Sequence, residues 1–119
     1  MANRSDRRLL NLLYVHQVFM EMRPEINMSQ VSAFVAAAFS QPDSEDEEAP
    51  TIKELSVLAG VPYSTMSRHY RYLGEKERQG KDGLGLVTVT INADDRRERN
   101  VHLTREGSLL KDQIVQLLQ

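Results

Sequence analysis

Residues 51–73, TIKELSVLAGVPYSTMSRHYRYL, decide the fold because they predict two short helices joined by a tight turn. Thr51 and Glu54 form a capping box, and apolar residues then recur at helical spacing up to Gly60. Val61 and Pro62 lead into a second helix over residues 63–73. This arrangement is typical of a helix-turn-helix, although ordinary helical hairpins produce a similar pattern.

The second of these helices has two unlike faces. At about 100° per residue, its apolar side chains share one face and can pack inward. The opposite face is polar and basic, and it comprises Ser64, Thr65, Ser67, Arg68 and Arg71. Such a face is suited to an anionic partner.

The periodicity changes from helix to strand further along the chain. Residues 84–91 alternate as a strand does, and Val101 and Leu103 supply a shorter return strand. The polar residues between them predict a hairpin with a charged tip that carries Arg96, Arg97 and Arg99. These arginines could reach a minor groove or its phosphates. The alternative is a solvated turn in which they pair with the neighbouring acidic residues, Asp94, Asp95 and Glu98.

Helices are predicted on both sides of this unit. Residues 5–22 predict a helix with apolar residues around most of its circumference. Such a helix must be covered on two sides, either by a second subunit or by the core of the same chain. A capping box at Asn27 and Gln30 starts another helix that extends to about Phe39. Thr104 caps a last helix that continues to the end of the sequence.

Charge is distributed unevenly along the 119 residues. The net charge of −2 argues against a nucleic acid partner, but residues 43–48 alone hold five acidic groups. Residues 64–105 hold nine basic groups against six acidic ones. Residues 40–50 therefore predict a solvated acidic loop with nothing to bury. The connector 74–85 predicts a mobile solvated loop, with phosphate contacts by Lys76, Arg78 and Lys81 as the alternative.

Composition excludes several classes of protein. The length predicts a single domain over residues 1–119, and the lack of cysteine excludes disulfides and thiolate zinc sites and suits the cytoplasm. Apolar runs are too short for a membrane span. No enzyme, metal or cofactor is expected, because His16, His69 and His102 lie in separate predicted elements without a catalytic or ligating partner.

The chain resembles the MarR family of winged-helix regulators. The resemblance rests on residues 51–68 and, more specifically, on residues 94–107, DDRRERNVHLTREG, where Asp-Arg-Arg leads through a short strand to Leu-Thr-x-x-Gly. It implies a mainly α fold with a small antiparallel β-hairpin (α+β). The winged helix-turn-helix would occupy residues 51–103, between helical dimerisation regions at residues 5–39 and 104–119.

The resemblance also implies a function. The chain would be a sequence-specific regulator of transcription, most simply a repressor, that binds double-stranded DNA as a homodimer on a near-palindromic operator. Bases and phosphates would be contacted by Ser64, Thr65, Ser67 and Arg68. Arg97 would reach the minor groove, and Asp95 would steady the wing arginines by ion pairing. Family members often respond to small anionic or phenolic ligands, but no particular effector is indicated. The alternative function is a winged-helix module that binds another protein, such as a polymerase or a replication factor.

Three features depart from the family pattern. Pro62 stands where a serine cap is common, so the start of the recognition helix is expected to differ slightly. The connector 74–85 is longer than usual. One helix, rather than two, follows the wing, so dimerisation is predicted to rely on the first helix and on Leu110, Ile114, Leu117 and Leu118 of the last one.

Overall fold

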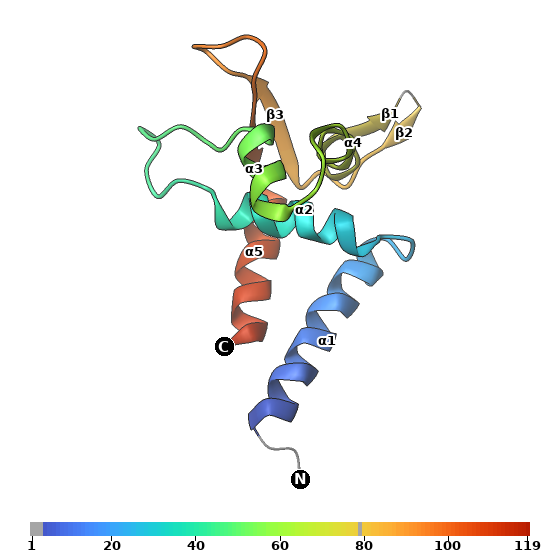
Figure 1. Cartoon of the computed structure of the whole chain (residues 1–119). Helices are drawn as coiled ribbons and strands as arrows, with labels where there is room; N and C mark the ends of the chain where they lie inside the picture. Colours follow the sequence, from blue (N-terminus) through green and yellow to red (C-terminus); the bar gives the residue numbers. More distant parts are fainter. Residues whose placement is uncertain (1–3, 79) are drawn as a thin grey trace.

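The computed structural model describes residues 4–78 and 80–119 (Figure 1). Its helices are α1 (Arg4–Met22), α2 (Met28–Phe39), α3 (Ile52–Ala59), α4 (Tyr63–Leu73) and α5 (Arg105–Leu118). Its strands are β1 (Lys76–Arg78), β2 (Lys81–Asp82), β3 (Val87–Ile91) and β4 (Arg99–Leu103). The predicted fold class, mainly α with a small antiparallel hairpin, is confirmed.

Helices α2, α3 and α5 begin where the sequence predicted, each at a side-chain cap. Asn27 Oδ1 accepts a hydrogen bond from the Gln30 amide at 2.9 Å, and Gln30 Oε1 accepts one from the Asn27 amide at 3.0 Å. The same reciprocal pair joins Thr51 and Glu54 at the start of α3. Gly60 ends α3 with a φ of 69°, a left-handed conformation that favours glycine.

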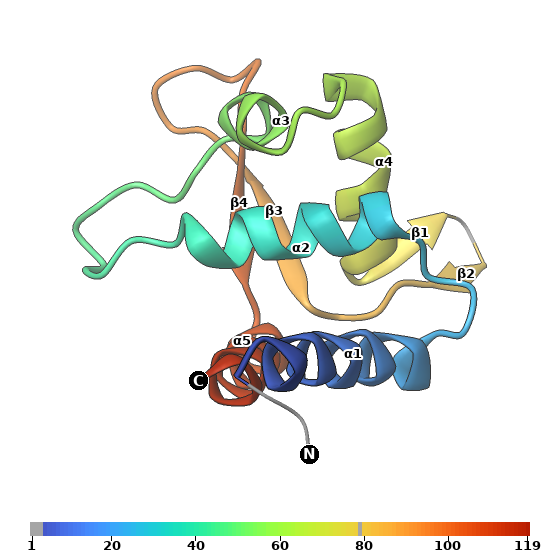
Figure 2. The same ribbon diagram turned by 60° about the horizontal axis from the view of Figure 1, so that its bottom comes forward.

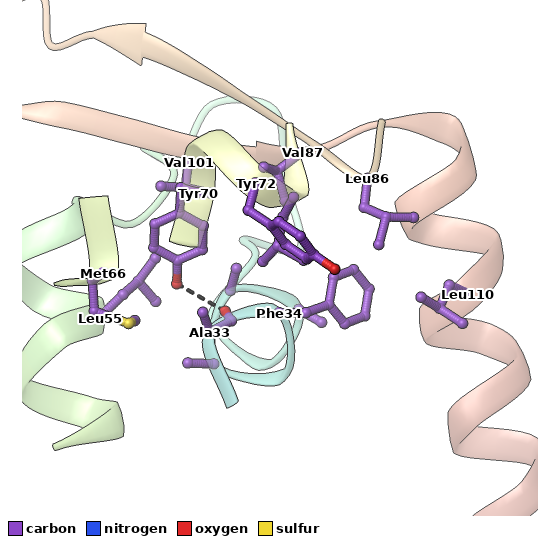
Figure 3. Packing of buried hydrophobic residues seen from close by; sticks show 14 of the residues in the cluster. Ala33, Phe34, Leu55, Met66, Tyr70, Tyr72, Leu86, Val87, Val101 and Leu110 are labelled. Carbon is purple, nitrogen blue, oxygen red and sulfur yellow. Dashed lines mark hydrogen bonds between the residues drawn. The ribbon is translucent and has the colours of Figure 1, made fainter. Parts of the chain in front are cut away.

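Helix α2 lies between the other helices (Figure 2). On one side of it lie α1 and α5, and on the other side lie α3 and α4. Phe19 of α1 and Phe34 of α2 meet edge to face, with their ring centroids 5.9 Å apart. Tyr70 of α4 is 1% exposed, and its hydroxyl donates a hydrogen bond to the Ala33 carbonyl of α2 at 2.8 Å (Figure 3). These contacts join the three layers into one core.

The predicted hairpin, which is the wing, is formed by β3, β4 and the loop between them. The two strands pair antiparallel in unbroken register from Val87 opposite Leu103 to Ile91 opposite Arg99. The expectation of a shorter return strand was wrong, because β4 has five residues, as β3 does. Val87 is buried, whereas Val89 and Ile91 are exposed. The hairpin therefore projects beyond the helices that cover its base.

Both ends of the acidic segment 40–50 are anchored, which corrects the prediction that this segment has nothing to bury. Residues 43–48 are exposed, as predicted. The Gln41 side chain, however, donates to the Val101 carbonyl at 3.0 Å and accepts from the Leu103 amide at 3.3 Å. The Val101 amide donates to the Pro50 carbonyl at 2.9 Å. These contacts cover the outer edge of β4, which would otherwise be open to another chain.

The connector 74–85 also differs from the predicted mobile loop, because it contains the β1–β2 hairpin. The chain then returns along the end of α4, where the Leu84 amide donates to the Tyr72 carbonyl at 3.0 Å and the Leu86 amide donates to the Leu73 carbonyl at 2.8 Å. The side chains of Lys76 and Arg78 lie outside the described part of the structure, so their contact with phosphate stays a prediction.

The Leu-Thr-x-x-Gly segment holds the start of α5 against the chain that leads into β3. Thr104 Oγ1 accepts a hydrogen bond from the Gly107 amide at 3.1 Å and donates one to the Gly85 carbonyl at 2.6 Å. A Cβ atom on Gly107 would collide with the carbonyl oxygen of Leu86. Position 107 therefore needs glycine for close backbone approach.

We expect Gly107→Ala to lower the free energy of unfolding by about 1–3 kcal/mol, because the added methyl group must displace backbone rather than a flexible side chain. Urea denaturation measures this change. Ser108→Ala, at the exposed neighbouring position, is the matched control and should change stability little. Equal stability of the two variants would show that α5 is not held in this way.

Candidate nucleic-acid interface

The turn between α3 and α4 is closed by backbone contacts. The Val61 amide donates to the Ser56 carbonyl at 3.1 Å, and the Met66 amide donates to the Pro62 carbonyl at 2.9 Å. Helix α4 begins at Tyr63, as predicted, and Pro62 at its N-cap makes no side-chain capping bond. The first peptide N–H groups of α4 therefore have no side-chain acceptor at the N-cap.

Helix α4 separates its residues as the sequence predicted. Met66, Tyr70 and Leu73 are buried in the core. The other face has three exposed residues, Ser64, Arg68 and Arg71, and two half-buried ones, Thr65 and Ser67. Arg68 Nη2 lies 3.5 Å from Thr65 Oγ1. This face therefore presents hydroxyl groups and guanidinium groups together.

His69 joins α4 to the start of α2. Its Nε2 lies 2.7 Å from Ser29 Oγ in a partly buried hydrogen bond. Burial lowers the pKa of His69, and the charge of neighbouring Arg68 lowers it further. Both effects favour the neutral imidazole.

Asp95 and Arg97 form a compact unit at the tip of the wing. The Asp95 carboxylate accepts hydrogen bonds from the Arg97 amide at 3.0 Å, from Nε at 3.2 Å and from Nη2 at 3.3 Å. These bonds lower the pKa of Asp95, and Asp95 in turn raises the pKa of Arg97. The Arg97 side chain is still 91% exposed. Its remaining donors can therefore meet a partner without breaking the ion pair.

The other two wing arginines differ from each other. Arg99 Nη1 donates to the carbonyl oxygens of Arg96 at 2.8 Å and Glu98 at 3.1 Å, so its guanidinium bridges the turn. Arg96 is exposed. The structure brings Arg96, Arg97 and Arg99 together at one tip, as predicted, but gives Arg99 an internal bracing contact that the sequence did not indicate.

The loop at the wing tip is held in place by two buried asparagines that sequence reasoning missed. Asn92 Oδ1 accepts from the amides of Asp94 at 2.8 Å and Asp95 at 2.9 Å. Its Nδ2 donates to Asn100 Oδ1 at 3.0 Å and to Glu48 Oε1 at 2.8 Å. Asparagine directly after a strand signals such a turn, but its burial depends on residues far away in the sequence.

Sequence reasoning also missed Lys53, which precedes the basic stretch at residues 64–105. It is exposed on the first turn of α3. A bridge between Thr51 and Asn100 places that turn beside the wing. The positive charge of Lys53 contributes to lowering the pKa of Asp95. Lys53 therefore adds positive charge close to the wing tip.

Two kinds of feature are absent from the described ranges, a cluster of metal ligands and a membrane-spanning helix. No three histidine or acidic side chains of residues 4–78 and 80–119 lie close enough together to hold a metal ion. In the same part of the chain, no helix is both long and apolar enough to cross a bilayer.

Comparisons with known proteins identify the fold. No protein-family model and no curated protein sequence matches the chain. Among solved structures, that of the S. aureus MepR–DNA complex has a TM-score of 0.64 and 20% sequence identity, over 89% of this chain and 74% of that chain.

Two further solved structures agree with it. A mutant of MarR from E. coli has a TM-score of 0.60 and 18% identity, over 99% of this chain and 77% of that chain. The M. tuberculosis transcriptional regulator MOSR in complex with DNA has a TM-score of 0.53 and 24% identity, over 96% and 69%. The predicted resemblance thus extends to three dimensions, and the chain has the winged helix-turn-helix fold of MarR-family regulators.

Proposed function

We propose that this protein is a non-enzymatic, sequence-specific regulator of transcription that binds double-stranded DNA as a homodimer. The observation that carries the proposal is the joint placement of two basic elements. The start of α4 and the wing tip lie at the end of the molecule opposite α1 and α5 (Figure 2). The fold shared with MepR and MOSR, each solved with DNA, supports the same function.

Each element fits one groove of the duplex. Helix α4 would enter the major groove, where a guanidinium such as that of Arg68 can bind guanine with two hydrogen bonds. The hydroxyl groups of Ser64, Thr65 and Ser67 can donate to phosphate, as can the first amides of α4. Arg71 lies further along the same face, within reach of the backbone of the duplex.

The wing would follow the adjacent minor groove. Its negative potential favours an inserted arginine, and Arg97 is the most suitable because Asp95 fixes its orientation while leaving donors exposed. Arg96 and Arg99 add charge beside it, and Lys53 adds a contact to phosphate at the start of α3.

The exposed apolar surface of α1 supports the homodimer. Val15 and Phe19 are buried in the core, but a row of large apolar residues on the same helix is exposed: Leu9, Leu10, Leu12, Leu13 and Tyr14. Covering these residues with a second copy removes them from water. A twofold dimer would present two α4 helices to half-sites about one helical turn apart. Occupying such an operator is the simplest way for a chain of this size to repress transcription.

Selection from a pool of random duplex DNA at two salt concentrations tests the function. We expect enrichment of a near-palindromic site and a steep loss of affinity as the salt concentration rises, because phosphate binding releases counterions. Absence of binding above background would contradict the proposal. It would favour a protein partner, whose largely apolar contact should depend little on salt.

We expect Arg97→Ala to weaken operator binding roughly tenfold to a hundredfold, because it removes the groove contact of the wing. Fluorescence anisotropy on the selected site measures the affinity, and circular dichroism checks that the fold is unchanged. Arg105→Ala removes an exposed arginine outside the proposed site and serves as the control. Equal affinities of the two variants would remove Arg97 from the interface.

The variant Asp95→Asn tests whether the Asp95 carboxylate orients Arg97 for DNA binding or is incidental to it. If Asp95 only pairs with Arg97 in a solvated turn, loss of its negative charge should strengthen DNA binding. We expect the opposite, a weakening of about threefold to tenfold, because Arg97 loses its charge-assisted hydrogen bonds and its fixed orientation. The same anisotropy assay measures the sign of the change, and stronger binding would contradict the orienting role.

A further inference from the structure

Two side-chain amides connect the acidic segment to the loop at the wing tip, residues 92–98, which we call the tip loop. Asn100 of β4 is 4% exposed, and Asn92, directly after β3, is 7% exposed. Asn100 Nδ2 donates to the Ala49 carbonyl at 2.6 Å, and Asn100 Oδ1 accepts from Asn92 Nδ2 at 3.0 Å. Asn92 Oδ1 in turn accepts from two backbone amides of the tip loop. A path of hydrogen bonds therefore leads from the acidic segment into the tip loop.

The path continues within the tip loop to Arg97. One of the two amides that donate to Asn92 Oδ1 belongs to Asp95, at 2.9 Å. The Asp95 carboxylate accepts hydrogen bonds from the amide, Nε and Nη2 of Arg97. The orientation of the Arg97 guanidinium thus depends on where Asp95 lies, and Asn92 holds the backbone of Asp95.

The two side-chain amides fit this path in one orientation only. Ala49 presents a carbonyl oxygen, which needs the Nδ2 donor of Asn100. The tip loop presents two N–H groups, which need the Oδ1 acceptor of Asn92. Nδ2 of Asn92 then meets Oδ1 of Asn100 between them. Because an unpaired donor or acceptor is costly when it is buried, these bonds hold the tip loop in one arrangement.

Glu48 adds a second contact between the acidic segment and the same path. Its Oε1 accepts a hydrogen bond from Asn92 Nδ2 at 2.8 Å. Glu47, the preceding residue, is exposed as Glu48 is, but among the described residues its side chain has no hydrogen bond to the wing. Both carboxylates repel phosphate. The two residues therefore differ in their contact with the wing rather than in their charge.

We propose that Asn92 and Asn100 are positioning residues for DNA binding, which transmit the fixed position of the acidic segment to Arg97. The inference rests on the proposed contact of Arg97 with the minor groove and names what holds that side chain ready. An arginine whose orientation is already fixed loses less conformational entropy when it binds. The acidic segment then supports DNA binding without contacting DNA itself.

A double-mutant cycle on the full chain tests the inference, with operator affinity measured by fluorescence anisotropy. Arg97→Ala is made in the wild type and in Asn100→Ala, which removes the central side chain of the path. We expect Arg97→Ala to weaken binding roughly tenfold or more in the wild type, but less than about threefold in Asn100→Ala, because Arg97 is no longer held there. Partial unfolding of Asn100→Ala would lower the affinity with and without Arg97 by the same factor, so it would leave this ratio unchanged.

Gln41→Ala is the matched control for the cycle. Gln41 attaches the other end of the acidic segment to β4 through Val101 and Leu103, away from the path to the tip loop. Arg97→Ala should therefore keep its full effect in this background. An effect of Arg97→Ala that is the same in the wild type, Gln41→Ala and Asn100→Ala overturns the inference.

Two single variants at exposed positions test the path without altering a buried side chain. Glu47→Ala and Glu48→Ala remove the same charge, which by itself should strengthen DNA binding. We expect Glu47→Ala to bind the operator at least as tightly as the wild type, and Glu48→Ala to bind about twofold to fivefold more weakly, because only the second variant loses a hydrogen bond to the path. Equal strengthening by both variants contradicts the inference.

The outcomes separate the inference from the proposed function. If Arg97→Ala weakens binding equally in every background, the positioning role fails and the contact of Arg97 with DNA stands. If Arg97→Ala has no effect in the wild type, or if the wild type binds no DNA, both fail.

Discussion

The packing of α4 against α2 is the constraint on which the rest of the structure depends. Tyr70 is buried, and its hydroxyl donates to a backbone carbonyl of α2 at 2.8 Å, with Met66 and Leu73 buried on the same face. A buried phenol without an acceptor is costly, so this bond fixes how α4 is rotated about its axis. That rotation places Arg68 and Arg71 on the outer face. The core and the candidate interface are therefore two consequences of the same packing.

The wing depends on a second constraint, the covering of β4. Gln41 and Pro50 bond to its outer edge, and Asn92 and Asn100 connect the start of the tip loop to the end of the acidic segment. An exposed hairpin of five-residue strands gains little stability alone. These contacts supply the support that lets the tip present Arg97 in a fixed orientation. The acidic segment is thus part of the wing's foundation as well as a charged surface.

Local signals made most of the fold predictable from sequence. The capping boxes at Asn27 and Thr51 lie within four residues, and the alternating apolar pattern of the wing is equally local. The missed features either depend on distant residues or lack an apolar pattern. Asn100 meets Ala49 across 51 positions, and the connector hairpin at residues 76–82 lacks an apolar pattern. The sequence alone placed the arginines at the wing tip. The hydrogen bonds that brace Arg99, and the closeness of Lys53 to the wing tip, became visible only in the folded structure.

The central claim is that α4 and the wing bind adjacent grooves of one operator, and footprinting on the selected site tests it most directly. Dimethyl sulfate reports guanine N7 in the major groove, and hydroxyl radicals report the sugars that line the minor groove. The account predicts two patches of protected guanines about one helical turn apart, each with a protected minor groove on its outer flank. A protein that binds without protecting guanines in either half-site would contradict it.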